Sequence, residues 1–137
     1  MELLRCSRLI RYWAPVFIWM AGIFYFSSRP NPLDFLPPSR YTSSIDKIAH
    51  VSEYAVLAFL LYRALKKRGG SSFAPPRFST SALIAFAYAV FDEIHQEFVP
   101  NREMQLVDLG YDLVGIIAAL GLIWMRERHS DKTKGHV

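Results

Sequence analysis

The stretch that decides the fold is residues 107–126, VDLGYDLVGIIAALGLIWMR, an apolar run with two aspartates near its start and one arginine at its end. A helix needs about 20 mainly apolar residues to cross a bilayer, and this run has that length. Three more apolar blocks of similar length occupy residues 10–27, 45–65 and 79–99. We therefore predict an all-α polytopic membrane protein with four transmembrane helices. Because the second and third blocks carry charges, a soluble four-helix bundle with an apolar surface is the alternative.

The composition fits one small membrane domain. The chain has 137 residues, of which 52% are hydrophobic and 15% aromatic, so we predict a single domain over residues 1–137. A basic start followed by an apolar block also describes a signal peptide. Residues 24–30, FYFSSRP, lack small residues at the usual cleavage positions, so we expect the first block to be retained as a helix.

The basic residues predict how the helices are oriented. Twelve of the sixteen Lys and Arg residues lie at or before the start of the first block, around the second connection, or at or after the end of the fourth block. The positive-inside rule places these regions, and both termini, in the cytoplasm. The pI of about 9.4 then reflects topology, and no nucleic-acid partner is expected. Since Cys6 is the only cysteine, no intramolecular disulfide can form.

Three of the predicted helices carry a polar face at the end that this topology places outside. Residues three or four apart share one helix face. The faces comprise Asp46, His50, Glu53 and Tyr54; Asp92 and Gln96; and Asp108 and Asp112. At about 1.5 Å per residue, His50, Asp92 and Asp112 each lie roughly 5–10 Å inside the predicted helix ends. Ionisable groups at membrane depth are costly unless they face the bundle interior, so we predict one outward-facing polar pocket between the second, third and fourth helices.

Within this pocket we predict two specific contacts. His50 and Asp92 are expected to meet at its centre, because each would be costly facing lipid. Arg102 is the only basic residue in the short connection between the third and fourth blocks. We expect it to pair with Asp92, Glu93 or Asp108, since a guanidinium binds a carboxylate with two hydrogen bonds.

Other polar or small residues fit structural roles. Asp108 could complement the dipole of the fourth helix, and Lys47 could extend to the lipid headgroups. His95 is expected to face the headgroups, because Asp92 and Gln96 define the polar helix face better. Gly115 is expected to mark close helix packing.

Together these motifs resemble the VanZ-like family. The family pattern is similar to D-K-x-x-H-x-x-x-Y at residues 46–54, D-E-x-x-Q-x-F-x-P-x-R at 92–102, and D-x-x-x-N or D with a following Gly at 108–115. Phe26-Ser27-Ser28 resembles the family's serine-containing exit from the first helix. The resemblance covers about residues 12–125. Asn101 stands where Gly is common, and Asp112 stands where Asn is common.

The resemblance implies a small multi-pass protein of the bacterial cytoplasmic (inner) membrane, in a family named after a member associated with low-level resistance to the glycopeptide teicoplanin. Expected partners are membrane lipid and a lipid-linked cell-wall precursor or glycopeptide. The predicted binding residues are Asp46, Lys47, His50, Glu53, Tyr54, Asp92, Glu93, Gln96, Arg102, Asp108 and Asp112.

Three functions are open at this point. The favoured one is a non-enzymatic envelope protein whose pocket binds a lipid headgroup or cell-wall precursor, with Arg102 contacting an anionic group. The second is an intramembrane enzyme on a lipid-linked substrate, in which His50 is the acid or base, Asp46, Asp92 or Asp112 orients it, and Arg102 stabilises developing negative charge. The third is a proton or cation pathway, which is disfavoured because the polar residues stop in the outer half.

The sequence predicts no cofactor. No dense metal-ligand motif such as HExxH or CxxC occurs, so metal binding is the less favoured interpretation. If a metal ion binds, the weak candidate ligands are His50, Asp92 and Asp112. Nucleophilic catalysis is also disfavoured, because Ser27 and Ser28 are the only serines expected near the pocket.

Overall fold

The computed structural model describes residues 2–30, 42–68 and 76–134, and these fold into four helices without a strand. The helices are α1 (Glu2–Ser27), α2 (Thr42–Arg68), α3 (Arg77–Gln96) and α4 (Leu106–Lys134). The prediction of an all-α chain with four helices is confirmed. All four helices extend beyond the predicted blocks at their basic ends, because an apolar run marks a membrane-length segment and does not fix where the helix begins or ends.

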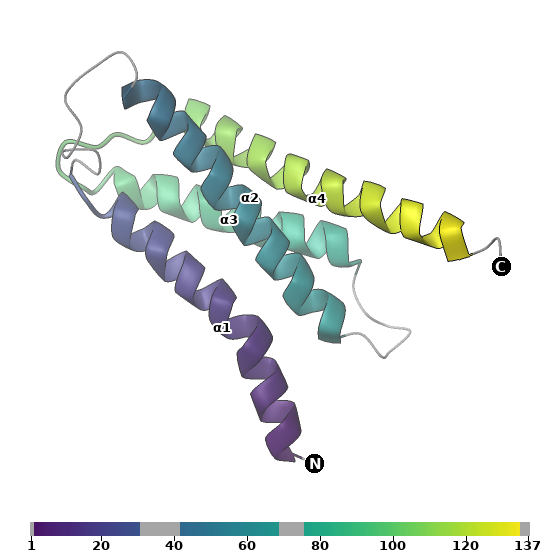
Figure 1. The fold of residues 1–137 in the computed structure, drawn as a ribbon. Helices are drawn as coiled ribbons and strands as arrows, with labels where there is room; N and C mark the ends of the chain where they lie inside the picture. Colours follow the sequence, from purple (N-terminus) through teal and green to yellow (C-terminus); the bar gives the residue numbers. More distant parts are fainter. Residues whose placement is uncertain (1, 31–41, 69–75, 135–137) are drawn as a thin grey trace.

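The central helix of the bundle is α2, which packs against α1, α3 and α4 (Figure 1). The end of α1, the start of α2, the end of α3 and the start of α4 gather at one end of the bundle (Figure 1). All the residues of the predicted pocket belong to this end, so the fold can bring them together.

The interior is built from large side chains of α2 and small side chains of α3. Tyr54, Leu57 and Leu61 of α2 are fully buried. On α3, the buried residues include Ser81, Ala85 and Ala89 at four-residue spacing. Small side chains at this spacing let two helices approach closely, as in membrane bundles.

Two of the four described helices are long and apolar enough to cross a membrane on their own: Ser44–Lys66 and Leu106–Ser130. Only 39% and 28% of their most apolar windows are buried within the bundle, unlike the core helix of a soluble protein. Of the four predicted spans, α2 and α4 are thus candidate spans by length and composition, and α1 and α3 are not. The mean hydropathy of α3 is lowered by the polar residues of its last turns. That of α1 is lowered by Arg11, Pro15 and its tryptophans and tyrosines.

Large apolar side chains also cover the outside of the bundle. They include Phe17 and Ile18 of α1, Leu83 of α3, and Ile117 and Leu122 of α4, all more than 60% exposed. Soluble monomers rarely expose contiguous apolar patches of this kind, so these faces argue against a soluble bundle.

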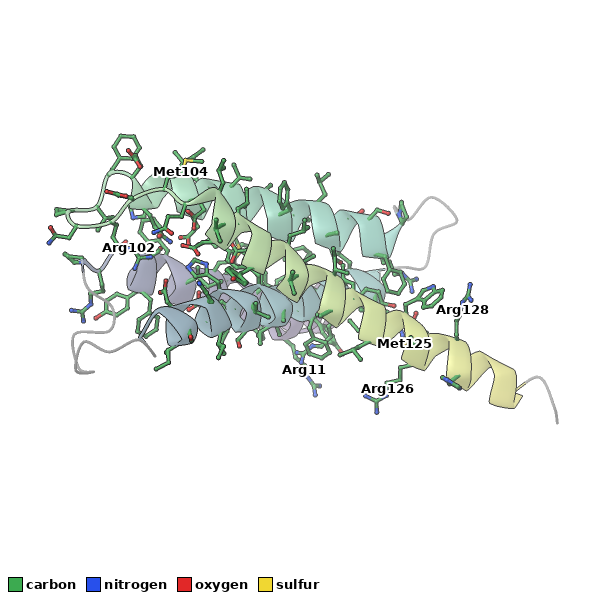
Figure 2. The ribbon with its side chains drawn as sticks, turned by 90° about the horizontal axis from the view of Figure 1, so that it is seen from above. Arg11, Arg102, Met104, Met125, Arg126 and Arg128 are labelled. Atoms are coloured by element: carbon green, nitrogen blue, oxygen red, sulfur yellow. The ribbon has the colours of Figure 1, made fainter. Side chains whose placement is uncertain are left out.

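Charge is distributed unevenly along the bundle. Figure 2 shows Arg126 and Arg128 towards one end of the molecule, and Arg102 and Met104 at the other. At the basic end, Glu127 of α4 accepts hydrogen bonds from Tyr62 and Lys66 of α2. This segregation agrees with the pattern from which we predicted the topology, and the orientation in a membrane remains a prediction.

Candidate functional site

His50 of α2 contacts Asp112 of α4, and not Asp92 of α3 as predicted from sequence. Its Nδ1 lies 2.9 Å from Asp112 Oδ1, and both side chains are buried. The reason for the different partner is Gly115, one turn after Asp112. A Cβ placed there would lie 2.2 Å from the carbonyl oxygen of Val51, so α4 touches the backbone of α2 at this point. The predicted contact between His50 and Asp92 is therefore wrong, and the expected close packing at Gly115 is confirmed.

Asp92 instead connects α3 to α1. Ser27 donates a 2.6 Å hydrogen bond to Asp92 Oδ1, and Gln96 donates a 3.1 Å hydrogen bond to Oδ2. Both carboxylate oxygens are thus satisfied by neutral donors. The pocket was predicted between the second, third and fourth helices, with no partner for Ser27 of the first. The serine-containing end of α1 was the signal that could have identified it.

Arg102 bonds an amide where a carboxylate was predicted. Its guanidinium donates to Gln96 Oε1, and within the described ranges no carboxylate lies within ion-pair distance of it. The predicted pairing with Asp92, Glu93 or Asp108 is therefore wrong. The turn that holds Arg102 passes through Asn101, whose φ of 62° is left-handed. Asn and Gly tolerate this conformation best, so Asn101 satisfies the same backbone requirement as the Gly common in the family.

Glu93 lies next to the contact between His50 and Asp112. It is 1% exposed, and its Oε2 accepts a 2.9 Å hydrogen bond from the backbone N–H of Gln105, which joins the end of α3 to the chain before α4. Its Oε1 has no hydrogen-bond partner among the described residues, and the same holds for Asp112 Oδ2 and the Tyr54 hydroxyl. Such buried, unpaired polar groups are costly, and they indicate a ligand or a functional constraint.

Three of the predicted binding residues lie at the edge of this region. Asp46, Lys47 and Glu53 are half-buried. The Lys47 ammonium lies 5.7 Å from the centre of the Tyr111 ring, a cation–π distance. Asp108 is buried in the first turn of α4, where its charge complements the helix dipole, in agreement with its structural role.

His95 contacts α1. Its Nε2 lies 3.0 Å from Ser28 Oγ, and its ring stacks on Phe24 with centroids 4.4 Å apart. It is half-buried in this contact, so the expectation that it faces the headgroups is not met.

The structure thus gathers most of the predicted residues into one buried group. We call this group the polar cluster, comprising Ser27, His50, Tyr54, Asp92, Glu93, Gln96, Asp108 and Asp112. Arg102 bonds its edge through Gln96. The predicted metal trio of His50, Asp92 and Asp112 does not assemble, because Asp92 turns to Ser27 and Gln96.

The arrangement has three chemical capacities. The imidazole of His50 and the carboxylate of Asp112 can exchange or hold a proton. The unpartnered oxygens of Glu93 and Asp112 can accept hydrogen bonds or bind a cation. The Arg102 guanidinium can bind an anion.

An all-α bundle with two candidate membrane spans and a polar cluster buried at one end is typical of a small membrane protein. The model of the family described as VanZ/LLP1 matches residues 12–127, so the chain belongs to the VanZ-like family. No curated protein and no solved structure matches the chain.

Proposed function

We propose that this protein is a multi-pass protein of the bacterial cytoplasmic membrane that binds the anionic headgroup of a lipid or lipid-linked cell-wall precursor at the outer end of its bundle. The observation that carries the proposal is the environment of Arg102. Its guanidinium bonds a neutral amide, so no carboxylate of the described chain neutralises it directly. An arginine in this state, at the edge of a membrane bundle, can bind a phosphate group.

The chemistry of the side chain supports a phosphate over other groups. A guanidinium presents five N–H donors in a planar fork that matches phosphate oxygens. One nitrogen is used by Gln96, whose own amide nitrogen donates to Asp92. The chain of hydrogen bonds from Arg102 through Gln96 and Asp92 to Ser27 holds one side of the guanidinium in place. We assign to these residues the role of positioning Arg102.

A headgroup site also supports a contribution to glycopeptide resistance, because the family takes its name from a teicoplanin-resistance protein. Among the proposed ligands, the cell-wall precursor fits this role, and teicoplanin itself is the alternative ligand. Teicoplanin susceptibility of cells that express the protein is the corresponding whole-cell measurement.

The test is lipid binding by the purified full-length protein in detergent, measured by native mass spectrometry. The probes are phosphatidylglycerol, a polyprenyl diphosphate and, as the zwitterionic comparison, phosphatidylcholine. We expect Arg102→Gln to weaken binding of an anionic probe by about tenfold or more, because charge-assisted hydrogen bonds contribute about 1.5–3 kcal/mol. Arg102→Lys should recover part of the affinity, since lysine keeps the charge and loses the planar fork.

The matched control is Arg29→Gln. It removes an exposed arginine at the same end of the bundle, where the Arg29 guanidinium contacts Tyr25. Its binding should equal that of the unmodified protein. Preference for phosphatidylglycerol would identify a phospholipid ligand, and preference for the diphosphate would identify a lipid-linked precursor. Equal binding by the Arg102→Gln variant, or an equal loss in both arginine variants, would refute the proposed site.

A further inference from the structure

We propose that His50, Glu93 and Asp112 bind a divalent transition-metal ion, of the class of Zn²⁺ or Mn²⁺, in the interior of the bundle. The proposal goes beyond headgroup binding and does not rest on it, because it uses none of the contacts of Arg102.

The three side chains come from three helices and converge. His50 belongs to α2, Glu93 to α3 and Asp112 to α4, and their ligand atoms all lie within 4.8 Å of one another. Their exposed fractions are 5%, 1% and 1%. Acidic side chains on a solvated surface can be close together without a ligand, whereas groups at this depth have lost their hydration and require partners.

The hydrogen-bond partners of the two acids are incomplete. Glu93 Oε1 and Asp112 Oδ2 are fully buried and have no partner among the residues the structure describes. Their other oxygens are used: Glu93 Oε2 by the Gln105 N–H, and Asp112 Oδ1 by His50 Nδ1. One free oxygen thus remains on each carboxylate. A cation between them would satisfy both.

Charge around the site favours the same conclusion. Asp92 and Asp108 are also buried nearby, and the donors to Asp92 are the neutral side chains of Ser27 and Gln96. Within the described residues, the only side chain of the polar cluster that can carry positive charge is His50. A divalent cation offsets this excess of acid.

The donor set indicates the kind of metal. One imidazole nitrogen and two carboxylate oxygens suit Zn²⁺, Mn²⁺ and related ions, whereas Mg²⁺ and Ca²⁺ prefer oxygen ligands alone. Three protein ligands leave room for a water or another oxygen in the coordination sphere.

A second possible ligand set, Asp46, His50 and Asp108, shares the histidine. It is the weaker one, because Asp46 is only half-buried and neither of its acids has a fully buried oxygen without a partner.

The test is metal binding by the full-length protein, purified in detergent and stripped with a chelator. Zn²⁺ and Mn²⁺ are titrated separately by calorimetry, and bound metal is measured by mass spectrometry after gel filtration. We expect about one equivalent of one of these ions per chain. Glu93→Gln and Asp112→Asn should each weaken binding by about tenfold or more, since each removes a charged ligand and keeps the side-chain size.

Two matched amide variants serve as controls. Asp46→Asn tests the second ligand set, and Glu103→Gln changes an exposed acid in the connection before α4. Glu103→Gln should bind as the unmodified protein does, and Asp46→Asn should weaken binding less than either site variant does. The proposal is overturned if the unmodified protein binds neither ion, if Glu93→Gln and Asp112→Asn both retain full affinity, or if Asp46→Asn alone loses it. Should the two site variants fail to fold, electron paramagnetic resonance of Mn²⁺ bound to the unmodified protein decides: no coupling to an imidazole nitrogen would also refute the site.

Discussion

Asp92 and its two neighbours in the polar cluster, Glu93 and Asp112, are acids with different roles. Both oxygens of Asp92 accept hydrogen bonds from neutral side chains, whereas Glu93 and Asp112 each keep one buried oxygen without a described partner. A fully satisfied carboxylate stabilises the packing of the helices around it. A half-satisfied carboxylate is available to a ligand. We therefore assign an architectural role to Asp92 and a binding role to Glu93 and Asp112.

The architectural role of Asp92 can be tested through Ser27. The Ser27→Ala variant removes the 2.6 Å hydrogen bond to Asp92 and leaves a buried acceptor unpaired. We expect a loss of about 1 kcal/mol in the free energy of unfolding. Hydrogen bonds in membrane bundles contribute roughly 0.6 kcal/mol on average. Leaving a buried polar group without a partner costs up to about 3 kcal/mol, so the expected loss lies between these two values. Unfolding in mixed detergent micelles measures it.

Ser28 provides the matched control, since it is the next residue and is only half-buried. Its hydroxyl donates to the carbonyl oxygen of Phe24 and contacts His95. Ser28→Ala should change the free energy of unfolding by less than about 0.5 kcal/mol. Equal losses in the two variants would show that the contact between Ser27 and Asp92 does not stabilise the bundle.

At the scale of the helices, the close approach of α2 and α4 decides which side chains meet. Gly115 faces the backbone of Val51, and a Cβ there would lie 2.2 Å from its carbonyl oxygen. The same approach brings Asp112, one turn earlier, against His50. The site therefore depends on one glycine that binds nothing itself.

We expect Gly115→Ala to lower the free energy of unfolding by about 1–3 kcal/mol, because the added methyl group forces the two helices apart. Gly121→Ala is the control in the same helix, where an added Cβ would meet nothing within 4 Å. That variant should be neutral or more stable by up to about 1 kcal/mol, because alanine favours helix. Unfolding in detergent measures the loss of stability. Metal titration measures a second expected effect, because moving α2 and α4 apart should also weaken the metal site. If both variants behaved alike, the close contact would not exist in the membrane-embedded protein.

Helical periodicity was sufficient to predict which polar residues share a face and lie at one depth, and His50, Asp92 and Asp112 are indeed all buried at one end. It could not predict their partners, because these depend on distances between helices. The distances follow from contacts far apart in sequence, such as Gly115 with Val51. For the same reason, periodicity could not predict the partner of Arg102, which depends on a turn with a left-handed residue at Asn101.

At the scale of the molecule, the described bundle combines three features of a membrane protein. Large apolar side chains cover its outside, a polar cluster is buried at one end, and Arg126 and Arg128 lie towards the other (Figure 2). Composition predicted the number of helices, because long apolar blocks separated by polar connections are visible in the sequence. Two helices, α1 and α3, do not reach the hydropathy of independent spans, and we propose that they cross the membrane as parts of the bundle. Their polar groups would then be satisfied by neighbouring helices, as the contact between Ser27 and Asp92 illustrates.

The central claim is that the end of the bundle that holds the polar cluster faces the outside of the cell, and single-cysteine labelling of intact cells tests it most directly. The background variant is Cys6→Ser, because Cys6 is the only native cysteine. Glu103→Cys places an exposed thiol in the connection before α4, next to Arg102. Ser71→Cys places a thiol in the stretch of sequence that the positive-inside rule assigns to the cytoplasm. We predict that a membrane-impermeant maleimide labels the Glu103→Cys variant in intact cells and labels the Ser71→Cys variant only after the cells are lysed. The reverse pattern would contradict the account, because it would place Arg102 and the polar cluster on the cytoplasmic side.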